Sequence, residues 1–190
     1  APWLTGFVWL LAAAGLAVAA TEGPAGLLSA VPLATLAYMG WWLAWYPAVV
    51  VSDREVTLRN PLATISVPWA ALVTVDTRYA LTLVTPRRKY TAWAAPAPGI
   101  IGVHRARPEH ATGLPETTYG PAASIRPGDL TSSDSGAAAY RVRRRWAELL
   151  AAGSVEPGSA GSVRVRVRPN WALIGAAAVL LAAAGAVVLA

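Results

Sequence analysis

The chain has 190 residues, of which 55% are apolar and 14% are charged, and its formal net charge is +6. A soluble domain has roughly 45–50% apolar and about 25% charged residues, so this composition argues against a wholly soluble protein. The chain has no cysteine, which excludes disulfides, thiol nucleophiles and cysteine-based metal sites.

Charge is confined to the middle of the chain. All sixteen lysines and arginines, and nine of the ten acidic residues, lie between Asp53 and Arg168, and Glu22 is the one charged residue outside this stretch. The composition therefore divides the chain into an apolar N-terminal block, a basic middle and an apolar C-terminal block.

Three apolar runs fill the two outer blocks, and each approaches the roughly 20 residues that a helix needs to cross about 30 Å of hydrocarbon. We therefore predict an α+β membrane protein with three transmembrane helices. Its predicted parts are a transmembrane hairpin over residues 1–47, a cytosolic domain over 48–168 and a third transmembrane helix over 169–190.

Two other interpretations of the first run are open. The sequence Ala17-Val18-Ala19 resembles the cleavage site of a signal peptide, but no basic residue precedes the run, as a signal peptide would require. A buried hairpin of a soluble protein is the second alternative, and it would leave too little polar chain to cover the hairpin.

The basic middle predicts the orientation in a bacterial cell membrane, because positive charge resists translocation. We expect a multi-pass protein whose N-terminus and middle domain are cytoplasmic and whose C-terminus is extracytoplasmic. Tryptophans fall at the predicted cytoplasmic ends of the helices, where an indole can anchor at the interface: Trp3, Trp41, Trp42, Trp45 and Trp171. The spanning parts of the runs contain no Asp, Glu, Lys, Arg or His, which argues against a transporter or channel.

Short β-rich segments with period two follow from residue 48, separated by turn residues. They are Val49–Val51, Val56–Leu58, Thr64–Val67, Val73–Val75, Ala80–Thr85 and Tyr90–Ala94. This spacing predicts an antiparallel sheet or small barrel. A long irregular insertion is then expected over residues 95–133, because that stretch is rich in Pro, Gly, Ser and Thr.

A helix is predicted after the insertion, capped by Ser133, Asp134 or Ser135 and closed by Gly153. Its apolar positions recur at helical spacing, at Ala139, Val142, Trp146, Leu149 and Leu150. Valine and arginine then alternate from Val163 to Arg168, as in a strand with one apolar and one cationic face.

A small antiparallel barrel or sandwich capped by one C-terminal helix is the outline of a pleckstrin-homology (PH) domain. The residues 49–60, Val67-Pro68-Trp69 and 90–96 resemble actinobacterial membrane-anchored PH-domain proteins of the low-molecular-weight protein antigen type. The resemblance covers roughly Trp41 to Ala95 and, more loosely, the helix around Trp146. It implies a fold and a membrane location, but no reaction or ligand. Phosphoinositide-binding relatives carry several basic residues in the first hairpin, where this chain has Asp53-Arg54-Glu55, so that ligand is not carried over.

Two groups of basic residues are candidate contacts for anionic lipid headgroups. One is the predicted hairpin tip Arg87, Arg88 and Lys89, and the other is the alternating set Arg164, Arg166 and Arg168. The alternative for both groups is that the side chains are solvated and only help to keep this part of the chain on the cytoplasmic side.

A candidate surface for a protein partner comprises Arg141, Arg144 and Arg145, in a cluster that also holds Arg143, together with His104 and His110. The alternative for the arginines is the solvated face of the helix, and for the histidines an exposed loop. Metal binding by the histidines and nucleic-acid binding by the arginines are disfavoured, because neither a metal-ligand spacing nor a nucleic-acid motif accompanies them.

No catalytic or cofactor fingerprint is present, so we expect a protein that is not an enzyme and has no cofactor. The first hypothesis is an adaptor or accessory subunit of a membrane complex, such as a respiratory or secretion assembly, with membrane lipids and other integral membrane subunits as partners. The alternative is a module that senses anionic lipids at the membrane surface.

Overall fold

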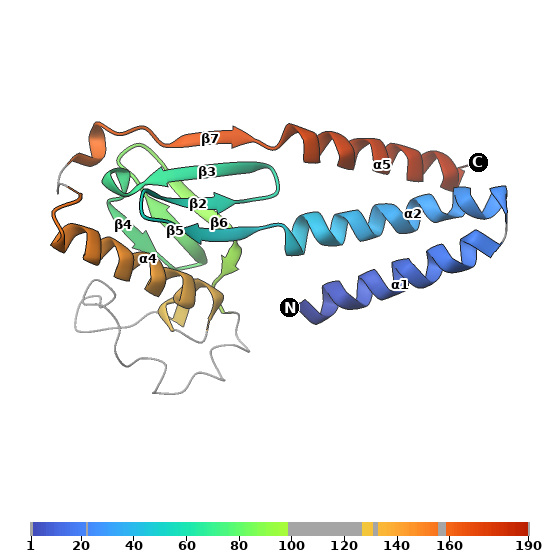
Figure 1. Ribbon diagram of the computed structural model, residues 1–190, viewed down its shortest axis with the longest axis horizontal. Coiled ribbons are helices and arrows are strands. Elements are labelled where there is room, and N and C mark those ends of the chain that lie inside the picture. Colours follow the sequence, from blue (N-terminus) through green and yellow to red (C-terminus); the bar gives the residue numbers. More distant parts are fainter. Residues whose placement is uncertain (1, 22, 99–126, 131–132, 156–158, 190) are drawn as a thin grey trace. The chain divides into compact units, whose positions relative to one another are not determined.

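The computed structural model describes residues 2–21, 23–98, 127–130, 133–155 and 159–189 (Figure 1). Contacts between residues divide the chain into two compact units, one of residues 1–47 and 169–190 and the other of residues 48–168. The first unit is helical, and the second combines two sheets with a helix.

Three helices form the helical unit: α1 (Pro2–Thr21), α2 (Pro24–Gly40) and α5 (Trp171–Leu189). Helix α2 contacts both of the others and lies between them (Figure 1). A single π-helical turn, η1 (Trp41–Trp45), continues α2.

Polar side chains of α2 join it to α5. The Tyr38 hydroxyl donates to the Leu173 carbonyl at 2.8 Å, and the Thr35 hydroxyl contacts the Leu180 carbonyl at 3.2 Å. On the other side of α2, Leu33 packs so closely on Gly15 of α1 that a methyl group on Gly15 would collide with it. The apolar surfaces of α1 and α2 are therefore partly used in helix packing.

Within the described residues, one helix, Trp171–Leu189, is long and apolar enough to cross a membrane. The prediction of three transmembrane helices, and of a multi-pass protein with them, is therefore wrong. The second apolar run does not fold as one helix, because α2 ends at Gly40 after 17 residues and the run continues through η1 into a strand. At about 1.5 Å per residue, α2 spans about 26 Å, less than the roughly 30 Å of a bilayer core.

Two antiparallel sheets form the second unit. One has the order β1-β2-β3-β7, with β1 (Ala48–Val51), β2 (Glu55–Arg59), β3 (Ala63–Pro68) and β7 (Arg166–Pro169). The other has the order β4-β5-β6, with β4 (Thr74–Asp76), β5 (Ala80–Val84) and β6 (Lys89–Pro96). The predicted strands and turns are thus confirmed over residues 48–96.

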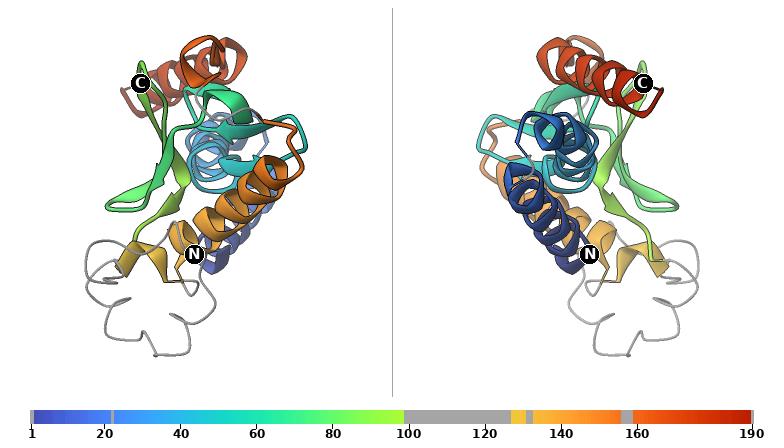
Figure 2. Two further views of the ribbon diagram at one scale, coloured as in Figure 1. Left: turned by 90° about the vertical axis from the view of Figure 1, so that its left-hand side faces the viewer. Right: turned by 90° about the vertical axis from the view of Figure 1, so that its right-hand side faces the viewer.

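Helix α4 (Asp134–Ala151) packs against strands of both sheets, namely β1, β4, β5 and β6 (Figure 2). The alternation along β2 and β5 explains the core, since every second side chain points inward. These inward residues are fully buried: Val56, Leu58, Leu81 and Leu83. From α4, Ala139, Val142 and Leu149 complete this core.

The ends of α4 agree with the sequence prediction. The Ser133 hydroxyl accepts a hydrogen bond from the Gly136 N–H at 2.9 Å, which satisfies a donor of the first turn. After the last turn, Gly153 adopts φ +66°, a left-handed conformation that glycine accepts without strain.

Two predicted segments differ from the structure. The alternating stretch from Val163 becomes a strand only at Arg166, and its apolar face ends early: Val163 and Val165 pack on the core, whereas Val167 is 48% exposed. The insertion expected from residue 95 is shorter at both ends, since β6 continues to Pro96 and the 3-10 turn η6 (Pro127–Asp129) is built into the domain. Residues 99–126 lie outside the described residues.

The Asn60 side chain joins the first sheet to β6. Its amide donates to the Thr91 carbonyl at 2.8 Å and accepts from the Trp93 N–H at 2.9 Å, as a neighbouring strand would. We expect Asn60→Ala to lower the free energy of unfolding by about 1–2 kcal/mol, because two hydrogen bonds are lost at a site that water reaches. Urea unfolding measures the loss. An unchanged midpoint for Asn60→Ala would contradict the prediction.

Candidate anion site

The turn between β5 and β6 is rigid and presents basic side chains. The Thr85 hydroxyl donates to the Arg88 carbonyl at 2.7 Å and accepts from the Arg88 N–H at 3.2 Å. The Thr85 N–H donates to the same carbonyl at 3.0 Å. Because these bonds hold the backbone of Arg88, its side chain projects from a fixed base.

The chain that follows α4 supplies a second basic side chain beside this turn. Val163 and Val165 both pack on the core, so Arg164 between them faces away from it and is exposed. The 3-10 turn η7 (Ser159–Gly161) precedes this segment and contacts the turn Trp69–Ala71, which fixes its path.

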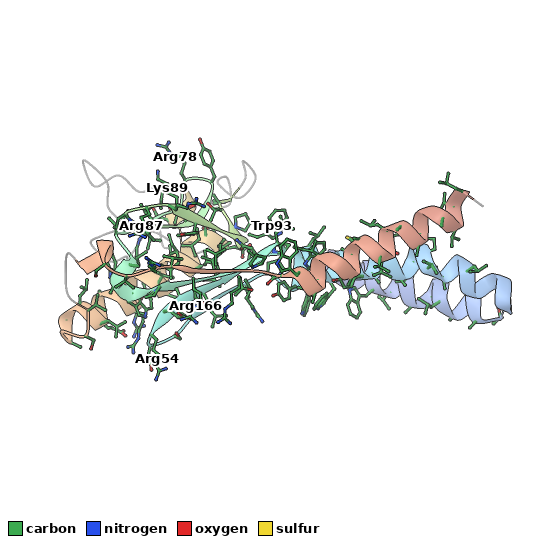
Figure 3. The ribbon with its side chains drawn as sticks, turned by 90° about the horizontal axis from the view of Figure 1, so that it is seen from above. Arg54, Arg78, Arg87, Lys89, Trp93 and Arg166 are labelled. Atoms are coloured by element: carbon green, nitrogen blue, oxygen red, sulfur yellow. The ribbon has the colours of Figure 1, made fainter. Side chains whose placement is uncertain are left out.

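A cavity of about 230 Å³ lies between the two segments. Its lining comprises Thr85, Pro86, Arg87, Arg88, Tyr90, Ala160, Val163, Arg164 and Val165. Three of the six predicted headgroup contacts, Arg87, Arg88 and Arg164, are thus brought to one site. The other three are exposed but do not line it: Lys89 starts β6, and Arg166 and Arg168 lie on β7 (Figure 3).

Of the arginines predicted as a partner surface on α4, Arg144 and Arg145 have carboxylate partners, whereas Arg141 is exposed and forms no ion pair among the described residues. Arg144 and Arg145 both bond Glu148, at 3.1 and 2.9 Å, and Arg145 also bonds Asp53 of the first hairpin at 2.7 Å. The hydrogen bonds from Arg145 and Arg144 hold the pKa of the Glu148 carboxyl below its usual value and raise the pKa of both guanidinium groups. This cluster is exposed, and much of its charge is already balanced within the domain.

Arg143 belongs to the core and not to the proposed partner surface, which corrects the arginine cluster expected from the sequence. Its side chain is 6% exposed and bonds the 3% exposed Asp129 at 2.7 Å. It also donates to the Val75 carbonyl at 2.8 Å, and the Thr77 hydroxyl donates to Asp129 at 2.8 Å. Sequence reasoning did not identify this network, although Arg143 follows Ala139 by one helical turn and so falls beside the apolar stripe.

The remaining predicted residues are distributed as follows. His104 and His110 lie outside the described residues, as does the side chain of Trp3. In the helical unit Trp42 is buried, Trp41 is half-buried, and Trp45 and Trp171 are 62% and 73% exposed. Trp41 and Trp45 also line an apolar cleft with Gly6 and Trp9.

Two sheets packed with one long helix, the order of the strands and the position of α4 place the fold among PH-like domains. Residues 46–129 match the family model described as bacterial PH domain. The chain contains a bacterial PH domain. No curated protein and no solved structure matches the chain with significance.

The match to the PH domain covers only one wall of the cavity. Arg87 and Arg88 lie within the matched residues, whereas Arg164 lies beyond residue 129. In the first hairpin of the PH domain, the Asp53 carboxylate forms an ion pair with Arg145. An anion that approached this hairpin would therefore meet a carboxylate that is already paired. Arg87, Arg88 and Arg164, by contrast, line the cavity described above.

Proposed function

We propose that this chain is a non-catalytic adaptor in which a PH domain is anchored to the bacterial cell membrane by α5. The observation that supports this proposal most directly is the junction between the PH domain and α5. Asn170 alone separates the end of β7 at Pro169 from the start of α5 at Trp171. Because β7 is part of the first sheet of the PH domain, one residue of chain connects that sheet to α5.

The exposed surface of α5 supports an anchoring role. Its 19 residues rise about 28 Å, close to the thickness of a bilayer core. Large apolar side chains are exposed along its length, including Val179 at 68% and Leu181 at 55%. An apolar surface of this extent is usually buried away from water, and lipid would bury it. Since basic residues stay on the cytoplasmic side, the PH domain with Arg166 and Arg168 is assigned to that side.

Disrupting α5 tests the anchor. We expect the double variant Val179→Arg/Leu181→Arg to leave the membrane fraction, because an arginine near the centre of a spanning helix costs about 2.5–3.5 kcal/mol by insertion scales. The measurement is the share of the protein that sediments with membranes after alkaline extraction. Val179→Leu/Leu181→Val is the matched control and should remain. Equal sedimentation of the two variants would show that α5 is not the anchor.

The adaptor role is tested by purification of the full chain in a mild detergent. We expect a stoichiometric integral membrane protein to accompany it, as an accessory subunit requires. Recovery of the chain as a lone monomer, under conditions that keep other membrane complexes intact, would contradict this role.

A second candidate function is the sensing of anionic lipids by the PH domain itself. It is favoured by the exposure of the basic residues on the β5–β6 turn and before α5, each worth about 1 kcal/mol near a charged surface. The anchor-disrupted full chain should bind vesicles of phosphatidylglycerol but not of phosphatidylcholine, and salt should weaken the binding. Arg87→Ala/Arg88→Ala/Lys89→Ala should lose it. Equal binding to both vesicles would remove this candidate.

A further inference from the structure

The cavity between the β5–β6 turn and Arg164 combines positive charge with the absence of a carboxylate. Its described lining includes three arginines, Arg87, Arg88 and Arg164, and no Asp, Glu or His. Among the described residues none of the three forms an ion pair. Three like charges that converge on one hollow repel each other, and a bound anion would relieve that repulsion.

Arg143, Arg144 and Arg145 on α4 do not have this property. Arg143 is neutralised by Asp129 in the core, and Arg144 and Arg145 share Glu148 and Asp53. The cavity therefore combines a hollow of about 230 Å³ with three arginines that form no ion pair among the described residues.

Size and charge together indicate the kind of anion. A cavity of about 230 Å³ is below the roughly 300–1,000 Å³ of pockets that take drug-sized ligands, so a small group fits it better. Guanidinium groups bind phosphate through paired, charge-assisted hydrogen bonds. A phosphomonoester has a charge of about −1.5 to −2 at pH 7 and matches three cations better than the single charge of a phosphodiester.

We infer that this cavity binds the phosphate group of a phosphomonoester, held by Arg87 and Arg88 from the β5–β6 turn and by Arg164 from the opposite segment. The inference rests on the proposed function for its biological setting, since a chain anchored by α5 would meet lipid phosphomonoesters at the membrane surface. The same chemistry is offered by free phosphate, and the two sources are separated by experiment.

The test uses the full chain in a neutral detergent, titrated with inorganic phosphate by calorimetry, and the full chain in nanodiscs that contain phosphatidic acid or phosphatidylglycerol. Arg88→Gln/Arg164→Gln should weaken phosphomonoester binding by about tenfold or more, because it removes charge-assisted hydrogen bonds from both walls. The matched control is Arg54→Gln/Arg78→Gln, which removes the same charge from two exposed arginines outside the lining and should change affinity less than about twofold (Figure 3).

A pH series adds a second readout. The lining has no carboxylate or imidazole within the described residues, so a change of binding near pH 6 is assigned to the ligand. Binding of phosphate should weaken between pH 7.5 and pH 5.5 as its second proton is taken up, at a pKa of about 6. Binding of phosphatidylglycerol should not follow this profile.

Each outcome decides the matter. Binding of phosphatidic acid alone, of inorganic phosphate alone or of both, with loss in the cavity variant only, supports the inference and names the source. Absence of binding to either, or equal effects of the cavity variant and its control, overturns it. Failure of the proposed anchor is separate, because Val179→Arg/Leu181→Arg should still bind inorganic phosphate, while Arg88→Gln/Arg164→Gln should still sediment with membranes.

Discussion

Replacing Asp129 by alanine is expected to lower the free energy of unfolding of the PH domain by about 3–5 kcal/mol. Asp129 is 3% exposed, and its carboxylate receives hydrogen bonds from Arg143 at 2.7 Å and from Thr77 at 2.8 Å. Without it, the guanidinium of Arg143 stays buried with the Val75 carbonyl but without a counter-charge. Chemical unfolding of the full chain in detergent, followed by tryptophan fluorescence, measures the loss.

Two further variants separate the charge pair from general damage. Asp134→Ala removes an exposed carboxylate from the first turn of α4 and should cost about 0.3–1 kcal/mol, through the helix dipole alone. Asp129→Ala/Arg143→Met should be less destabilised than Asp129→Ala, because no buried charge is left unpaired. An equal loss in the free energy of unfolding for Asp129→Ala and Asp134→Ala would contradict this prediction. It would mean that water reaches the Arg143 guanidinium, contrary to its burial.

The position of this ion pair explains how the domain tolerates a long insertion. On one side of residues 99–126, the Ala97 N–H donates to the Tyr79 carbonyl at 2.9 Å. On the other side, Asp129 binds Thr77. Both flanks are thus fixed to one turn, between β4 and β5. An insertion whose two ends are held together adds little closure entropy to the folding of the rest of the domain.

Local patterns made the sheets and α4 predictable from the sequence. Strands such as β2 and β5 alternate buried and half-buried positions, and the turns that follow β1, β2 and β5 contain Ser and Asp, Asn and Pro, or Pro. The cap at Ser133 and the stop at Gly153 likewise depend on residues a few positions apart. Such features are encoded within one turn or one strand, and a single sequence is enough to read them.

Features that depend on distant contacts were not predictable in the same way. The sequence predicts the change from helix to strand at residue 48, but only the fold shows that α2 ends at Gly40 and that a π-helical turn over Trp41–Trp45 follows it. Arg143 differs from Arg144 in its environment and not in its chemistry. The cavity joins Arg88 to Arg164, and nothing local to either residue indicates the other.

Replacing Gly136 by alanine is expected to destabilise the domain by about 1–3 kcal/mol, although glycine to alanine within a helix ordinarily stabilises it by about 0.5–1 kcal/mol. The reason is steric. A methyl group on Gly136 would lie well inside contact distance of the Leu130 carbonyl and of the Asp129 backbone. Those neighbours are main-chain atoms next to the buried ion pair, so they cannot move aside as a flexible side chain would. Chemical unfolding again measures the change.

Gly128 and Gly161 provide the comparison that isolates this effect. A methyl group on Gly128 would collide with the Thr77 carbonyl, so Gly128→Ala should be destabilising by a similar amount. Gly161 has no atom within 4 Å of the same position, and Gly161→Ala should stay within about 0.5 kcal/mol of the parent. Because Gly128 and Gly136 both pack on the backbone around Thr77 and Asp129, a loss at both with none at Gly161 would locate the tightest packing of the domain at this junction. A stabilised Gly136→Ala would show instead that η6 can move away from α4.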